Sequence, residues 1–157
     1  MQIQDLIIKT EKYPWRLLHP SQPDSLKKTS EKRLEKLKKS LVSSGFAMSF
    51  YVFEKNGMIY TIDGHHRIKA LHSLYEDGVE IPIEFTCSFL NVRDDKHLKK
   101  LILAFNSHYA EIQKEGLMDF IYGIDENEIN EEFEFDISPI EEKEKKTRTC
   151  PHCGKDL

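Results

Sequence analysis

Hydrophobic residues recur along the chain at two spacings, one typical of helices and the other typical of strands. From a cap at Thr29 or Ser30 to a stop at Gly45, apolar positions keep helical spacing against a lysine-rich face. These positions are Leu34, Leu37, Leu41 and Val42. The pattern predicts an amphipathic helix over residues 31–44.

A β-hairpin is expected next. Runs of aromatic and β-branched residues at 50–53 and 58–62 flank Asn56-Gly57, a pair that favours the positive φ angles of a hairpin turn. The second run leads directly into a polar segment, after which apolar residues return at helical spacing. Residues 63–75 are therefore predicted to form a strand-to-helix junction.

The remaining segments complete a mixed pattern. Residues 5–10 read as a short strand or extended arm, and residues 13–23, which hold three prolines, as an ordered loop. Residues 81–87 predict a further strand. Helices are expected over about 94–105 and around 117–121. This order predicts an α+β fold in which helices flank a mixed sheet.

Charge divides the chain into unequal parts. Residues 124–146 carry ten acids and three bases, which leaves residues 1–123 with a net charge of +2. We expect one folded domain over residues 1–122, a disordered acidic C-terminal tail that forms a linker over residues 123–147, and a short terminal unit over residues 148–157. A net charge of +2 is too small to argue for DNA binding by itself.

Composition also bears on the compartment. The chain has no apolar run near the ~20 residues that cross a bilayer, and its N-terminus lacks the order of a signal peptide. The three cysteines are an odd number, which suits a reducing compartment better than a disulfide framework. We expect a cytoplasmic protein without a membrane partner.

The terminal unit contains a zinc-knuckle spacing. Cys150 and Cys153 lie three positions apart, with Pro151 and Gly154 favouring the turn that would present both thiolates. They supply two of the four ligands that Zn²⁺ needs, and His152 is poorly placed to complete the set. A zinc site within one chain, a zinc-bridged homodimer and no metal all remain open.

The strand-to-helix junction carries the strongest chemical signal. Gly64 lets the backbone approach a ligand, and the first amides of a helix have no partner within it. His65, His66, Arg67 and Lys69 add side-chain donors in the same turn. Any one of these residues alone would be an ordinary surface or core residue. Together they predict a phosphate-binding site.

Two further polar residues join this prediction. Asp63 could hold Mg²⁺, act as a base, or orient His66 or Arg67. Asn106 follows a helix end, where its amide could face a nucleotide or simply cap the helix. We take Asp63 and His66 as candidate catalytic residues, and Asn106 as a candidate nucleotide contact.

Residues 63–71 resemble the signature of the ParB and sulfiredoxin-like superfamily, and the resemblance extends over about residues 30–122. The resemblance implies that the turn from Gly64 to Arg67 contacts the phosphates of ATP, ADP or CTP, with Mg²⁺. Sulfiredoxins carry their reactive cysteine where this chain has His65, so reduction of cysteine sulfinic acid is not expected. In chromosome-partition proteins an arginine stands where this chain has Lys69.

The resemblance leaves three functions open. Small ParB-like proteins of phages and mobile elements imply a nucleotide-binding protein in DNA modification, partition or regulation. Free-serine kinases on this fold share the Asp-Gly-His-His-Arg string, with Asp63 and His66 assisting phosphoryl transfer and with Glu11 or Glu31 as the further glutamate. A ParB-like nuclease is the third.

A lysine-rich stretch and two aromatic residues offer nucleic-acid contacts as well. The lysines could follow a phosphate backbone, although a solvated helix face explains them equally well. They are Lys27, Lys28, Lys32, Lys36, Lys38 and Lys39. Tyr13 and Trp15 could stack on bases, although core packing is the commoner use, and Cys87 is expected to be a buried apolar residue.

Overall fold

The computed structural model describes residues 1–107 and 112–134. Within these ranges the elements are β1 (Ile7–Pro14), the 3-10 helix η1 (Trp15–Leu17), β2 (His19–Pro20), α1 (Glu31–Ser44), β3 (Phe50–Lys55), β4 (Met58–Asp63), α2 (His65–Glu76), β5 (Glu84–Leu90), α3 (Asp95–Asn106), α4 (Lys114–Phe120) and α5 (Glu126–Glu132). None of the helices in the described part of the chain is long and apolar enough to cross a membrane.

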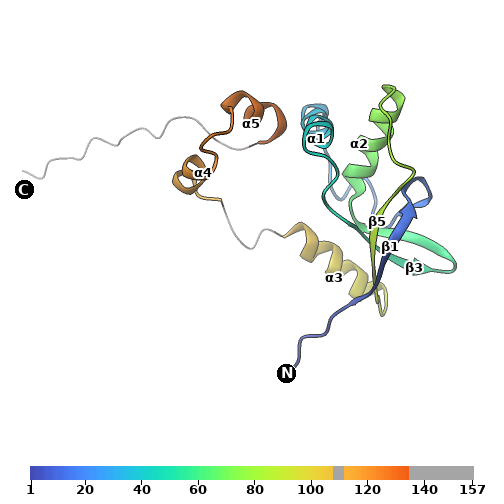
Figure 1. The fold of residues 1–157 in the computed structure, drawn as a ribbon. Coiled ribbons are helices and arrows are strands. Elements are labelled where there is room, and N and C mark those ends of the chain that lie inside the picture. The colour runs from blue at the N-terminus through green and yellow to red at the C-terminus, as the bar shows by residue number, and fades with distance from the viewer. Residues whose placement is uncertain (108–111, 135–157) are drawn as a thin grey trace, which may run out of the picture.

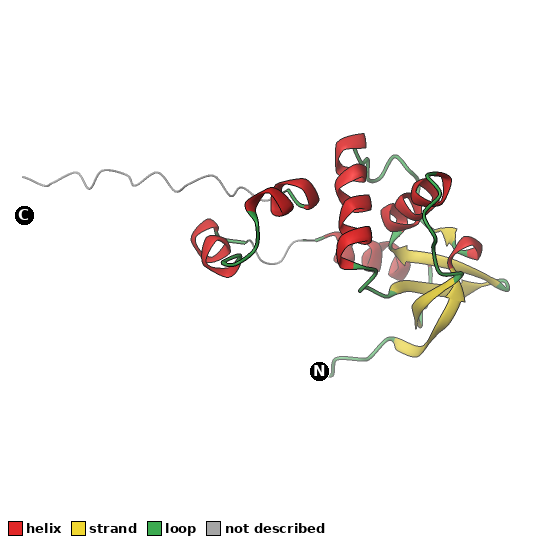
Figure 2. Ribbon diagram, turned by 45° about the horizontal axis from the view of Figure 1, so that its top comes forward, coloured by secondary structure: helices red, strands yellow, loops and turns green. Residues whose placement is uncertain are grey.

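The five strands form one mixed sheet in the order β1-β5-β3-β4-β2. β1 runs antiparallel to β5, and β3 runs antiparallel to β4. The β3–β5 and β4–β2 pairs are parallel. The α+β architecture predicted from the sequence is confirmed, with helices on both faces of the sheet (Figures 1 and 2).

Alternation along the strands divides the apolar side chains between two cores, because successive residues point to opposite faces. Val52 and Ile59 lie in the core beneath α1 and α2, with Leu71 of α2. Phe53 and Ile62 lie in the other core, where Ile102 of α3 covers them. Figure 1 shows α1 and α2 side by side and α3 apart from them.

The large core beneath α1 and α2 also shows the roles of two aromatic residues that the sequence left open. Trp15 is 2% exposed, and its Nε1 donates to the carbonyl of Pro82 at 3.1 Å. Tyr13 packs against the same core, edge-on to Phe89. These aromatic residues are used for packing. Cys87 is fully buried, as predicted.

Local signals confirm the central helix and hairpin. Ser30 caps α1 by accepting a hydrogen bond from the amide of Arg33 at 3.2 Å, and Gly45 ends it with φ of 81°. Asn56 and Gly57 both have positive φ, 54° and 75°, as the predicted hairpin turn requires.

Strand boundaries at the sheet edge differ from the predictions. β1 continues to Pro14 because it pairs with β5 as far as Glu84. The predicted loop therefore contributes the end of β1 and the two-residue β2. The predicted strand at 81–87 instead spans Glu84–Leu90, because Pro82 has no amide to donate.

The acidic segment is partly helical, which differs from the predicted unstructured linker. Asp125 caps α5 by accepting a hydrogen bond from the amide of Asn127 at 2.7 Å, and Ile129 packs against Leu117 and Ile121. This buried apolar contact stabilises residues 126–132 in spite of their charge. Residues 135–157, which include Cys150 and Cys153, lie outside the described residues.

Salt bridges join α5 to α1. Arg33 Nε lies 2.7 Å from Glu134 Oε2, and Lys39 Nζ lies 3.3 Å from Glu131 Oε2. Lys36 donates to the carbonyl of Phe133. Part of the basic face of α1 therefore contacts an acidic segment of the same chain.

Candidate phosphate-binding site at the first turn of α2

The turn between β4 and α2 requires glycine. Gly64 has φ of 112°, a left-handed value that L side chains rarely adopt. A Cβ at this position would lie only 2.4 Å from Cδ1 of Phe50. The backbone therefore turns directly over Phe50 of β3, and this contact fixes where α2 begins.

The N-terminus of α2 presents uncapped amides. Gly64 has no side chain to cap the helix, and the first turn contains no acidic residue. The first helical amide that bonds back is that of Ile68, which donates to the carbonyl of Gly64 at 3.0 Å. The amides of His65, His66 and Arg67 thus point out of the helix end, where its dipole favours an anion.

Arg67 is directed inward from this turn. Its Nη1 donates to the carbonyls of Met48 and Ser49 at 3.1 and 3.2 Å, and its Nη2 donates to Asp63 Oδ2 at 2.7 Å. The guanidinium carbon lies 5.1 Å from the centre of the Phe50 ring. Only 11% of the side chain is exposed. Arg67 therefore ties α2 to the segment entering β3, a role that the sequence did not suggest.

Asp63 is the partner of this guanidinium. Burial lowers the pKa of Arg67, and the nearby Asp63 carboxylate opposes that shift. Of the three roles predicted for Asp63, orienting Arg67 is the one that the geometry displays.

His65 and Lys69 meet an anion supplied by the chain itself. His65 Nε2 and Lys69 Nζ each lie 2.8 Å from Oδ1 of Asp24, which comes from the loop between β2 and α1. The hydrogen bonds from Lys69 and then His65 lower the pKa of Asp24 to about 2. A carboxylate thus occupies part of the position predicted for a phosphate.

His66 lacks the partners that its neighbours have. Both ring nitrogens are buried and make no hydrogen bond. Burial, followed by the charge of Lys27 and then those of His65 and Lys69, lowers the pKa of His66 from its ordinary value. Such a donor group surrounded by cations is suited to an anionic ligand, because buried polar groups without partners are rare.

Asn106 approaches the same region through Lys27. Lys27 Nζ donates to Asn106 Oδ1 at 2.8 Å, and Asn106 Nδ2 donates to the carbonyl of Ile102 at 2.7 Å. Lys27 belongs to the same loop as Asp24, which contacts His65 and Lys69, so this loop links the end of α3 to the first turn of α2. The predicted residues from Asp63 to Lys69 and Asn106 are therefore brought into one region.

A basic hollow of about 420 Å³ lies beside this turn. Its lining residues are Asp24, Ser25, Lys27, Lys28, Thr29, Leu34 and Lys69. Sequence reasoning included Lys27 and Lys28 only as a basic stretch, and missed Asp24 altogether. A short polar loop before a helix cap carries no sequence signal for contact with residues forty positions later.

Three further lysines of that stretch, Lys36, Lys38 and Lys39, have other partners. Lys38 is nearly buried and pairs with Glu35 and Asp77 at 2.9 and 2.7 Å, which joins α1 to the end of α2. Lys36 and Lys39 contact the α5 segment. Contact of the stretch with a nucleic-acid backbone stays a prediction.

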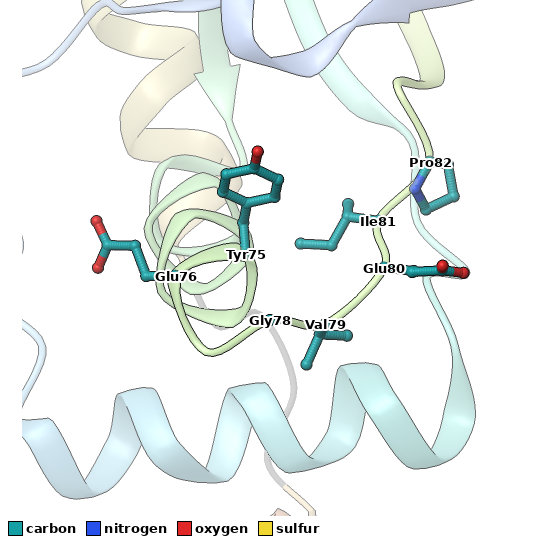
Figure 3. Close-up of a pocket in the computed structure, with 7 residues that line it drawn as sticks. All are labelled: Tyr75, Glu76, Gly78, Val79, Glu80, Ile81 and Pro82. Carbon is teal, nitrogen blue, oxygen red and sulfur yellow. The ribbon is translucent and has the colours of Figure 1, made fainter.

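A second hollow, of about 910 Å³, lies at the opposite end of α2 and has a different chemistry (Figure 3). Tyr75 of α2 and Ile81 of the following loop both face it. Its lining includes Glu76 and Glu80 and no basic side chain. This hollow would repel a phosphate, so volume alone does not identify the anion site.

Metal sites are not evident among the residues that the structure describes, because no group of three histidine, cysteine or acidic side chains converges there. Asp63, for which Mg²⁺ binding was one of three predicted roles, forms an ion pair with Arg67.

Comparisons with known proteins bear on the fold. No protein-family model matches the sequence, and no curated protein matches it. The structure is similar to the C-terminally truncated chromosome-partitioning protein ParB from Caulobacter crescentus complexed with CTP-γ-S. The TM-score is 0.59 and the identity is 16%, over 79% of this chain and 70% of that chain.

Two further similarities are weaker, with TM-scores below 0.5, and are not used to assign the fold. Sulfiredoxin from Arabidopsis thaliana gives 0.44 at 18% identity, over 60% of this chain and 97% of that chain. The same ParB complexed to the centromeric parS site gives 0.43 at 18% identity, over 77% of this chain and 63% of that chain. From the first comparison, the chain has the ParB-like fold that the resemblance of residues 63–71 predicts.

Proposed function

We propose that this chain binds a nucleotide by its phosphates at the first turn of α2. The observation that carries the proposal is the His66 ring, whose two nitrogens are buried without partners beside the uncapped helix amides. Lys27, His65 and Lys69 supply positive charge around it. Oriented amides and cationic donors together form the kind of site that phosphates occupy at helix N-termini.

The ligand class in this proposal is ATP, ADP or CTP with Mg²⁺. The ParB of similar fold was crystallised with CTP-γ-S, which favours testing CTP first. Because Asp63 is engaged by Arg67, the phosphates together with water would supply most Mg²⁺ ligands, since this ion commonly keeps several waters. The fold does not determine the base.

The biological role we propose is a nucleotide-dependent step in a DNA transaction of phage or mobile-element type. Its supports are the resemblance of residues 63–71 to small ParB-like proteins and the ParB-like fold. Glu11 does not favour a kinase, because it lies on β1 and pairs with Lys9, whereas Glu31, the other candidate glutamate, begins α1. β1 stands three places from β4 in the sheet, about 14 Å away at ordinary strand spacing.

Calorimetric titration of the full chain with CTP, ATP and ADP, each with and without Mg²⁺, tests the proposal. His66→Asn removes the ring Nε2 and the ability to take up a proton but keeps a polar side chain of similar size, and should weaken binding about tenfold or more. Lys99→Gln, on α3, is a matched loss of a lysine for Lys69→Gln, and only the Lys69 variant should weaken binding. Failure of all three nucleotides to bind would refute the proposal.

A further inference from the structure

Asp24 holds a position that a bound phosphate would need. Its Oδ1 lies 2.8 Å from both His65 Nε2 and Lys69 Nζ, so one oxygen accepts from two donors of the α2 turn. These donors keep the carboxyl ionised, with a pKa of about 2. Asp24 therefore stays negative across the physiological pH range.

A carboxylate and a phosphate compete for these donors, because the single Nε2–H of His65 can be donated to only one of them. Two anionic oxygens brought to one pair of donors would repel each other at close range. Phosphate binding at His65 and Lys69 therefore requires the Asp24 side chain to leave. The two anions exclude one another.

The position of Asp24 allows it to leave without disturbing the core. Its side chain is 74% exposed, and it lies in a turn where the amide of Leu26 donates to the carbonyl of Pro23. Ser21, bonded to the carbonyl of Thr61, anchors the loop before the turn. Lys27, bonded to Asn106, anchors it afterwards. The carboxylate can thus swing outward while the ends of the loop stay fixed.

We propose that Asp24 is a resident anion that closes the phosphate site until a ligand displaces it. This inference rests on the proposed function and describes how ligand access to the same site is regulated. A resident competitor reduces the population of open sites, so it weakens every phosphate ligand by one common factor. A carboxylate that contacted ribose or Mg²⁺ would instead strengthen particular ligands.

Asp24→Asn separates these roles. The amide keeps the shape of the side chain and removes its charge, so calorimetry of the full chain should show CTP, ATP, ADP and pyrophosphate all binding tighter. Because exposed ion pairs hold Asp24 weakly, we expect a gain of about three- to tenfold, equal for each ligand that binds. The melting temperature should hardly change, because the side chain is exposed.

Asp95→Asn is the matched control. Asp95 pairs with Lys55 of the hairpin. Its substitution by asparagine also removes one negative charge from the protein. Asp95 begins α3 at the end opposite Asn106, about 16 Å away at 1.5 Å per residue. At physiological ionic strength, charges farther apart than about 8 Å are largely screened, so this variant should bind like the wild type. An equal gain in both variants would overturn the inference, because the gain would then come from net charge.

Other outcomes are equally decisive. Unchanged or weaker binding by Asp24→Asn, with a wild type that binds, would overturn the inference and leave the proposed function intact. A gain for nucleotides but not for pyrophosphate would also overturn it. Absence of binding by both proteins would overturn the proposed function and this inference together.

Discussion

Arg67 provides the sharpest test of how the site is built, because the structure gives it a structural role where the sequence suggested a ligand contact. The substitution Arg67→Ala removes a side chain that is 11% exposed and that donates to Met48, Ser49 and Asp63. It leaves two backbone carbonyls and one carboxylate without their donor.

The expected loss of stability follows from these contacts. Breaking a buried ion pair by removing one partner costs about 3–5 kcal/mol, because the remaining charge stays buried. Water can reach Asp63, which is 29% exposed, so we expect the lower end, about 3 kcal/mol. Arg67→Lys keeps the charge but loses the fork that spans three acceptors, and should cost about half as much.

Urea unfolding followed by circular dichroism measures both losses. Arg16→Ala is a matched control, because Arg16 is exposed and rests on the ring of Tyr75. It should change the free energy of unfolding by less than about 1 kcal/mol. A similarly small effect of Arg67→Ala would refute the structural role. A large effect means that lost nucleotide binding in Arg67→Ala cannot be assigned to a phosphate contact.

Three further predictions concern single residues. Gly64→Ala should cost about 3 kcal/mol or more in chemical unfolding, because it adds a clash with Phe50 to the strain of positive φ. Gly57→Ala has the same strain in open space and should cost about 1 kcal/mol; equal costs would contradict the close contact. Because burial, then neighbouring cations, lower the pKa of His66, and a bound phosphate would favour its protonated form, nucleotide affinity should rise as pH falls from about 8 to about 6. Titrations in buffers of different ionisation enthalpy should show proton uptake, and His66→Asn should show less; equal uptake would contradict the assignment. Burial raises the pKa of Cys87 to about 11, so peptide mapping should find it unalkylated at pH 8 in native protein and alkylated after unfolding, whereas rapid native labelling would contradict its burial.

Much of the fold follows from local signals in the sequence. Helix α1 has a cap at Ser30 and a stop at Gly45, and the hairpin has Asn56-Gly57 at its turn. These features depend on neighbouring residues alone. The segment 126–132 was predicted to be unstructured because it is highly charged and has one apolar residue, Ile129. The burial of Ile129 depends on α4, which local sequence does not reveal.

The candidate site was found from sequence in part. His65 and Lys69 lie four positions apart on one helix, so their convergence follows from helix geometry. The inward direction of Arg67 depends on where β3 begins, and the contact of Asp24 depends on the path of a loop. Neither is set by local spacing, which is why the sequence predicted the site and not its internal partners.

The most direct test of the phosphate site is a backbone amide NMR titration of the labelled full chain with CTP, ATP and ADP in the presence of Mg²⁺. Phosphate binding at this turn should shift the amides of His65, His66 and Arg67 most, because they point out of the uncapped end of α2. Shifts centred instead on Gly78 and Val79 in the hollow at the other end of α2, or no shifts at all, would contradict it.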